Sequence, residues 1–175
     1  MDTRFLLRRW SLSAAGRHKQ DFDEGAGQYY FESARQPYWL EQIGKSDWGA
    51  GAYLYELFSN GSFFDAVGEH SKVLLLVEDK ALISFCTYAE KDDIQPTELT
   101  PWVGFVYTFP QYRGHRYIGK LFEKIEELAK EGQTRQVYIS TNHMGLYEKY
   151  GCEFFKEMKD MDGELSMVYR KSIRG

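Results

Sequence analysis

The chain has 175 residues, 43% of them hydrophobic, which is enough for one packed core, so we expect a single domain over residues 1–175. The net charge of -4 argues against a nucleic-acid partner, because binding to a phosphate backbone requires a basic face. No run approaches the roughly 20 apolar residues of a membrane-spanning helix, and the first residues do not form a secretory signal, so we expect no membrane partner and a cytoplasmic location.

The first third of the chain mixes strand-like and helix-like segments. Residues 4–10 read as a first strand, and residues 11–27, which are polar and contain glycine, read as a loop. Helix-like spacing over residues 38–43 and 50–58 predicts one or two helices, followed by a short turn over residues 63–67. Aromatic residues crowd this region, and they either cover one face of the sheet or wall a substrate pocket.

The middle of the chain reads as β-structure. Residues 73–77 are all apolar, and residues 81–89 continue in β-formers after a polar turn, so the two runs predict an antiparallel hairpin. A polar loop over residues 90–101 follows. Residues 102–108 are dense in aromatic and β-branched side chains, with one glycine at position 104, and they predict a central strand.

The last third begins with an amphipathic helix. From Ile118, apolar residues recur at steps of three and four, and Gly132 ends the pattern. A strand, a short helix and a terminal hairpin follow, over residues 137–139, 145–150, and 153–158 with 164–170. This order is typical of an α+β fold, in which the strand-helix-strand unit over residues 102–140 should be parallel and right-handed.

Cysteine and histidine usage argues against a disulfide framework or a metal site. Cys86 and Cys152 are the only cysteines, and each lies in a strand-like run, so we expect both to be reduced core residues. No HExxH motif, Cys/His ligand set or Ser-His-Asp arrangement is present. We therefore expect no metal and no hydrolase chemistry.

Between the central strand and the amphipathic helix lies the sequence FPQYRGHR, residues 109–116. Such a turn brings free backbone N–H groups to the positive end of a helix dipole, a combination that binds phosphate. Gly114 would let a phosphate approach closely, and Arg113 and Arg116 could add positive charge. Many strand-to-helix turns carry glycine and arginine for solubility alone, so the residues by themselves leave both interpretations open.

Three segments, FVYTFPQYRGHRYIGKLF, VYIST and GLYEKYGCEF, together resemble the two signature segments of the GNAT family of N-acetyltransferases. The resemblance extends over residues 102–155. Gln111 and Gly114 fit the family's pattern of Gln or Arg, two residues and Gly, whose amides hold the pyrophosphate of coenzyme A. Arg116 stands where the family has a second small residue, and it either donates to phosphate or obstructs the loop. Ile118 replaces a glycine, for which Gly119 could partly compensate.

The resemblance implies a GNAT-like mixed sheet of about seven mostly antiparallel strands flanked by helices, with a splayed parallel pair around the strand-helix-strand unit. It implies acetyl-CoA as co-substrate and a small-molecule or peptide amine as acceptor. The chain would act as a monomer or as a homodimer. The residues it assigns to acetyl-CoA are Val106, Tyr107, Thr108, Arg113, Gly114, His115, Arg116, Tyr117, Ile118, Gly119 and Asn142.

Asn142 lies five residues before Tyr147 rather than the family's usual seven, where Ser140 stands. Capping of the short helix is an equally good interpretation of Asn142. His143 reads as a surface histidine, with a role as base as the alternative.

The resemblance makes Tyr147 the general acid that protonates the departing thiolate; a buried packing role is the alternative. An amine with a pKa of about 10.4 is charged at neutral pH, so a base is also required. The central strand contains no carboxylate, and the nearest ones are Glu90, Asp92, Asp93 and Glu98 in the preceding loop. We expect Glu98 to be the base, closely followed by Glu90, because both abut strands; for each of the four, a solvated loop charge is the alternative.

The expected reaction is direct attack of a neutral primary amine on the acetyl-CoA thioester. The alternative is a non-catalytic module of the same fold that senses coenzyme A or binds another protein.

Overall fold

The computed structural model describes residues 25–174, through which one seven-stranded sheet runs in the order β1-β2-β3-β4-β5-β7-β6. Its strands are β1 Gly25–Tyr29, β2 Lys72–Glu78, β3 Ala81–Ala89, β4 Trp102–Thr108, β5 Gln136–Thr141, β6 Glu153–Lys159 and β7 Leu165–Ser172. The α-helices are α2 Gln36–Gly44, α3 Gly49–Ser59, α4 Phe63–Val67 and α5 Tyr117–Glu131, and the short 3-10 helices are η1 Tyr30–Glu32, η2 Pro110–Tyr112 and η3 Tyr147–Tyr150.

The strand pairing confirms the predicted α+β class. Every neighbouring pair in the sheet is antiparallel except β4 and β5, which are parallel. Six of the predicted strands are found, whereas residues 4–10 lie outside the described residues. The prediction of a loop over residues 11–27 was wrong at its end, because β1 begins at Gly25 and pairs with β2 at the sheet edge.

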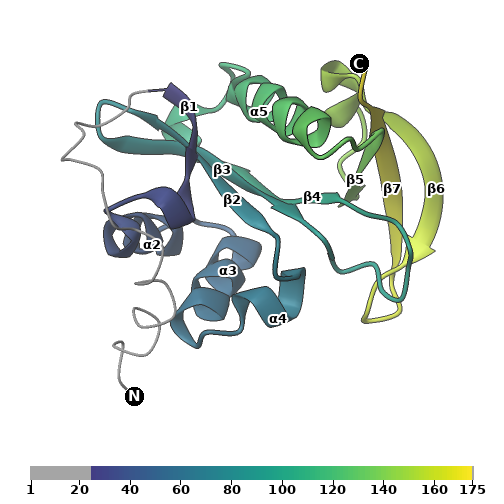
Figure 1. Cartoon of the computed structure of the whole chain (residues 1–175), viewed down its shortest axis with the longest axis horizontal. Coiled ribbons are helices and arrows are strands. Elements are labelled where there is room, and N and C mark those ends of the chain that lie inside the picture. Colours follow the sequence, from purple (N-terminus) through teal and green to yellow (C-terminus); the bar gives the residue numbers. More distant parts are fainter. Residues whose placement is uncertain (1–24, 175) are drawn as a thin grey trace.

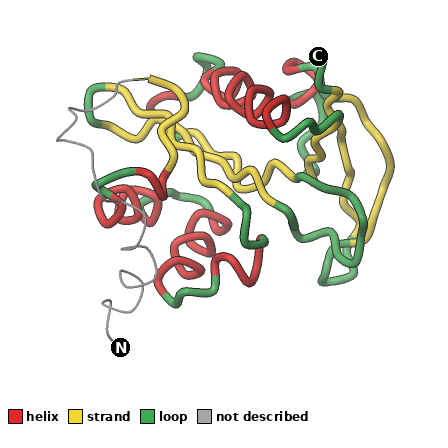
Figure 2. Tube along the Cα trace, in the orientation of Figure 1, coloured by secondary structure: helices red, strands yellow, loops and turns green. Residues whose placement is uncertain are grey.

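Helices cover both faces of the sheet (Figures 1 and 2). Helices α2, α3 and α4 lie on one face and α5 lies on the other. Strand β2 serves both layers, because alternate side chains of a strand point to opposite faces. Val73 and Leu75 pack on the side of α2 and α3, whereas Leu74 and Leu76 pack with α5. Burial on both faces explains why this run lacks any polar alternation.

Helix α5 confirms the predicted amphipathic pattern, with one residue added at its start and Gly132 at its C-terminal end. Its apolar side is buried: Leu121, Phe122, Ile125, Leu128 and Ala129. The short helix predicted over residues 145–150 is shorter in the structure, where residues 144–146 form a turn and residues 147–150 form the 3-10 helix η3, closed by left-handed Gly151. No helix within residues 25–174 combines the length and apolarity needed to cross a bilayer.

Both cysteines are buried and unbonded, although Cys152 lies just before β6 rather than inside a strand.

The parallel pair β4 and β5 separates almost at once, as predicted. Its pairing is confined to Trp102 with Tyr138, next to a 3.0 Å hydrogen bond from the Tyr138 N–H to the Pro101 carbonyl. Further along β4, Phe105 adopts a left-handed φ of 50°, and the register with β3 shifts at this point. A bulge of this kind bends its strand. The carboxyl halves of β4 and β5 are therefore apart, and the space between them is open to a ligand.

Candidate active site

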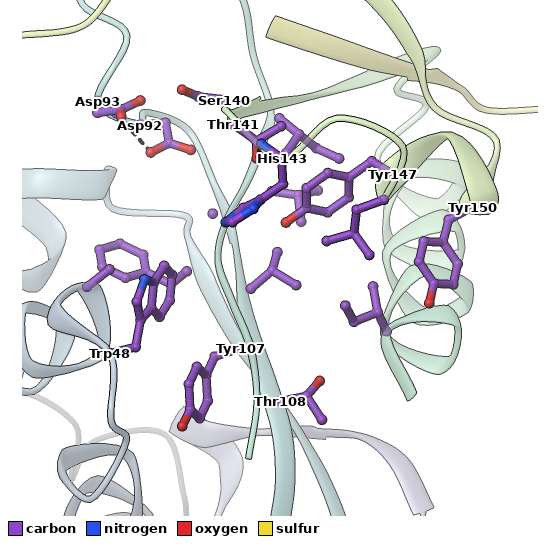
Figure 3. A pocket seen from close by; sticks show the side chains of 18 of the residues that line it. Trp48, Asp92, Asp93, Tyr107, Thr108, Ser140, Thr141, His143, Tyr147 and Tyr150 are labelled. Carbon is purple, nitrogen blue, oxygen red and sulfur yellow. Dashed lines mark hydrogen bonds between the residues drawn. The ribbon is translucent and has the colours of Figure 1, made fainter. Parts of the chain in front are cut away.

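A cavity of about 940 Å³ lies where β4 and β5 diverge (Figure 3). Its walls come from these two strands, the turn into α5, the region of η3, helices α3 and α4, and the loop before β4. A volume of this size matches that of clefts that bind small molecules. Two parts of it differ in chemistry: the loop end, formed by Arg113, Gly114, Arg116, Tyr117 and Ile118, and the acidic end, formed by Asp92 and Asp93.

The loop end presents unpaired backbone donors. Gly114 and Arg116 both have positive φ, 86° and 59°, and α5 begins at Tyr117. Within the described part of the chain, the N–H groups of residues 114–118 have no backbone hydrogen-bond acceptor. An added Cβ at Gly114 would meet nothing within 4 Å, so glycine is favoured there by its backbone conformation. Five adjacent N–H groups at a helix N-terminus form a site for an anion such as a pyrophosphate.

Arg113 is held by protein groups. Its Nε donates to the Thr108 carbonyl at 3.0 Å, and its guanidinium lies 3.3 Å from Asp47 Oδ1. The same carboxylate oxygen accepts a 2.6 Å hydrogen bond from the Tyr107 hydroxyl, and this bond, more than Arg113, lowers the pKa of Asp47. The Trp48 ring stacks on Tyr107 with centroids 5.8 Å apart. This network joins the turn after β4 to the start of α3.

Most of the predicted cofactor residues meet in this cavity. Eight of them line it: Val106, Tyr107, Thr108, Arg113, Gly114, Arg116, Tyr117 and Ile118. The cavity lining does not include His115, Gly119 or Asn142. Gly119 lies against the Tyr150 ring, and Asn142 is exposed. Ser140, at the more usual spacing from Tyr147, does line the cavity.

Tyr147 enters the cavity from η3, opposite the loop before β4. Its side chain is only 6% exposed, its ring packs 6.1 Å from that of Phe122, and it points toward His143 in Figure 3. Burial raises the pKa of the Tyr147 phenol well above its usual value of 10.0. The hydroxyl is therefore protonated at neutral pH and can serve as a proton donor, while the ring contributes to the core.

These features, a splayed parallel strand pair, a nest of amides at the N-terminus of α5 and a tyrosine facing the gap, agree with a sequence comparison. A model of the GNAT acetyltransferase family matches residues 28–152, which is more than half of the chain. The chain belongs to the GNAT acetyltransferase family. None of the curated proteins matches it at a significant level.

Solved GNAT structures resemble this chain in fold. An aminoglycoside 6'-N-acetyltransferase complexed with coenzyme A shares 12% identity, with a TM-score of 0.59 over 82% of this chain and 96% of that chain. The aminoglycoside 6'-N-acetyltransferase from Enterococcus faecium also shares 12% identity, with a TM-score of 0.58 over 82% of this chain and 95% of that chain. A Bacillus anthracis protein described as a streptothricin acetyltransferase, in complex with acetyl-CoA, shares 14% identity, with a TM-score of 0.50 over 61% of this chain and 64% of that chain. At such identities the likeness shows the fold alone.

The acidic end of this GNAT protein contains a carboxyl with an unusual pKa. Burial, assisted by the neighbouring charge of Asp93, raises the pKa of Asp92 to about 7, although the Asp93 N–H donates to its Oδ1 at 2.8 Å. Figure 3 shows Asp92 and Tyr147 on either side of the cavity, with His143 between them in that view. A carboxyl with a pKa near the working pH is well suited to accept a proton.

Glu98, the expected base, does not line the cavity. Its side chain is exposed, in the second half of the same loop. Glu90 is not in the lining either, and its carboxylate accepts a 3.1 Å hydrogen bond from the His70 N–H. Closeness to a strand in sequence was therefore a poor guide. The sequence feature that could have indicated Asp92 was Gly104, because a glycine inside a strand often marks a place where another group approaches the backbone closely. A Cβ at Gly104 would lie 3.0 Å from Asp92 Oδ2.

The aromatic residues of the first third divide between the two expected roles. Tyr30, Trp39 and Phe58 are core residues on the α2 and α3 face of the sheet. Trp48 and Tyr53, by contrast, line the cavity and remain partly exposed. They form an aromatic part of the wall of this GNAT site.

Proposed function

We propose that this chain catalyses transfer of an acetyl group from acetyl-CoA to a primary amine, by direct attack of the amine on the thioester. The observation that carries the proposal is that Asp92, Tyr147 and the start of α5 with its unpaired N–H groups line one cavity. We assign Asp92 as the proton acceptor and Tyr147 as the proton donor. Membership of the GNAT family supports the same reaction.

At the loop end, the N–H groups of residues 114–118 bind the pyrophosphate of acetyl-CoA. Arg116, which lines the cavity with an exposed side chain, adds positive charge there. Backbone groups of Val106, Tyr107 and Thr108, which face the gap beside β5, hold the pantetheine arm. The thioester then lies near the middle of the cavity.

Asp92 takes the proton from the incoming ammonium group. Presenting an amine of pKa about 10.4 as a free base at pH 7 requires about 4.6 kcal/mol. A neighbouring carboxylate that titrates at about pH 7 reduces this requirement, because it accepts the proton inside the site. The neutral nitrogen attacks the carbonyl carbon, and backbone N–H groups of β4 polarise the carbonyl oxygen.

Tyr147 completes the reaction. As the carbon–nitrogen bond forms and the carbon–sulfur bond breaks, the electron pair of the breaking bond goes to sulfur. The Tyr147 hydroxyl protonates the resulting thiolate, and the phenol recovers its proton from solvent. Its raised pKa keeps it in the donating form throughout the pH range of the assay.

Calorimetry with acetyl-CoA, combined with a thiol-release assay over a panel of primary amines, tests the proposal. We expect binding at micromolar concentrations and release of coenzyme A only when an amine is present. Binding without turnover would instead support a coenzyme A sensor. No binding at all would support a protein-interaction module and would refute the proposed function.

A further inference from the structure

The acidic end of the cavity contains two consecutive carboxylates, and we propose that they select an acceptor with two ammonium groups, such as an alkyl diamine. This inference rests on the proposed function, because it concerns the acceptor side of the same site. One ammonium group gives its proton to Asp92 and so becomes the nucleophilic amine. The other pairs with Asp93 and fixes the orientation of the acceptor.

The two carboxylates lack a counter-ion. Asp92 and Asp93 both line the cavity, but no cationic side chain within residues 25–174 forms an ion pair with either. The cationic side chains in the cavity wall are Arg113 and Arg116 at the loop end and Lys149 in η3. Burial raises the pKa of both carboxyls, and Asp160 contributes further negative charge near Asp93. Asp93 is exposed and accepts a hydrogen bond from Ser140, but among the described residues neither carboxylate is neutralised by a cation, and a bound dication would pair with both.

The loop before β4 is anchored so that both carboxylates stay in place. Ile94, directly after them, is buried with Trp102 and Val168 in a small core cluster. The Met161 N–H donates to the Asp93 carbonyl at 2.9 Å, which joins the loop to the turn between β6 and β7. The carboxylates are therefore held before any ligand arrives, as a selective site requires.

A buried hydroxyl beside Asp92 points to the same ligand chemistry. Thr87 on β3 is 1% exposed, and among the described residues its Oγ1 has no hydrogen-bond partner. The absent side chain of Gly104 lies between this hydroxyl and Asp92, since a Cβ there would be 3.0 Å from each oxygen. Unsatisfied buried hydroxyls are rare and require an explanation. Gly104 and Asp92 line the cavity, and the unpaired Thr87 hydroxyl lies directly behind the Gly104 backbone, so an ammonium group bound to Asp92 would rest on a surface with no side chain in the way.

The aromatic part of the cavity wall suits the carbon skeleton of such an acceptor. Trp48 and Tyr53 are 38% and 49% exposed, and the Tyr53 ring lies 6.2 Å from that of Phe105. All three line the cavity. Their faces can cover methylene groups and attract a cation. A monoamine would use this wall and Asp92, but it would leave Asp93 without a cationic partner.

The test compares 1,4-diaminobutane with n-butylamine, which has the same carbon chain and one ammonium group fewer. We expect kcat/KM for the diamine to exceed that for the monoamine by about fivefold or more. Asp93→Asn should abolish this preference by lowering kcat/KM for the diamine more than that for n-butylamine, and Asp93→Glu should restore part of it. Asp162→Asn, which removes one negative charge from the nearby turn but leaves the cavity intact, should keep the full preference.

Equal kcat/KM for the two amines, or a preference that survives in Asp93→Asn, would overturn the inference. If no amine is acetylated, the proposed function fails, and calorimetry of the coenzyme A complex with each amine then decides the inference separately. Tighter binding of 1,4-diaminobutane that is lost in Asp93→Asn supports recognition of two ammonium groups. Equal binding of both amines refutes it.

Discussion

Replacing Asp92 with asparagine is expected to slow acetyl transfer and to stabilise the fold at neutral and alkaline pH. Burial is the largest cause of the rise in the pKa of this carboxyl from 3.8 to about 7. A carboxyl whose pKa is higher in the folded than in the unfolded state favours folding while it is protonated. That contribution is complete below about pH 4 and is lost as the pH rises through about 7.

The size of the effect follows from the shift. Ionisation of Asp92 destabilises the folded state by at most about 4 kcal/mol, since one pKa unit corresponds to about 1.36 kcal/mol. The carboxylate borders the cavity, where solvent screens its charge, so we expect about 2 kcal/mol. Asparagine retains an acceptor for the Asp93 N–H but carries no charge. A gain of about 2 kcal/mol raises the Tm of a domain of this size by about 4–8 °C.

Two assays measure these outcomes. Thermal melts should show a difference in Tm between Asp92→Asn and wild type that grows from pH 4 to pH 7 and then levels off. In a thiol-release assay, wild-type kcat/KM should rise with an apparent pKa of about 7. The variant should lose this dependence and about 10² to 10⁴ of the rate.

Glu98→Gln is the matched control, because it neutralises an exposed carboxylate of the same loop outside the cavity. A full-rate Asp92→Asn enzyme with an unchanged pH profile would refute the reasoning. Loss of the pH dependence in Glu98→Gln instead would make Glu98 the base.

Four further substitutions test the remaining parts of the site. Gly114→Asp places a carboxylate beside the phosphate and strains a φ of 86°, so calorimetry should detect no acetyl-CoA binding by the folded variant. Arg116→Gly should weaken acetyl-CoA binding and reduce the salt dependence of that binding. The Tm should hold or rise, because glycine adopts a φ of 59° without strain, and tighter acetyl-CoA binding would show that Arg116 obstructs the loop. Tyr147→Phe should lower kcat by about 10² to 10⁴ with KM for acetyl-CoA nearly constant, and an unchanged chemical step would leave this ring a packing role. Gly104→Ala should displace Asp92 and reduce kcat without affecting acetyl-CoA affinity, which calorimetry can verify.

The parts of the fold that could be predicted are those whose hydrophobic period is unambiguous. The three- and four-residue steps in α5 and the dense β-formers of β4 placed both elements within one residue of their observed bounds. Strand β1 could not be found in this way, because GAGQY has neither alternation nor β-branched residues. Its conformation depends on pairing with β2, a contact between segments far apart in the sequence.

The same distinction explains why the position of Tyr147 in the cavity could be predicted and that of Asp92 could not. Coenzyme A is expected to contact main-chain groups of one continuous segment, from β4 through the turn into α5, and Tyr147 follows in a local motif, so sequence spacing describes this half well. Asp92 reaches the cavity only because Ile94 enters a separate core cluster and the turn between β6 and β7 binds the loop through Met161. No local pattern encodes a contact between residues 93 and 161. Gly104 is the exception, since a residue without a side chain in a strand of large ones already indicates that another group, here Asp92, must lie against it.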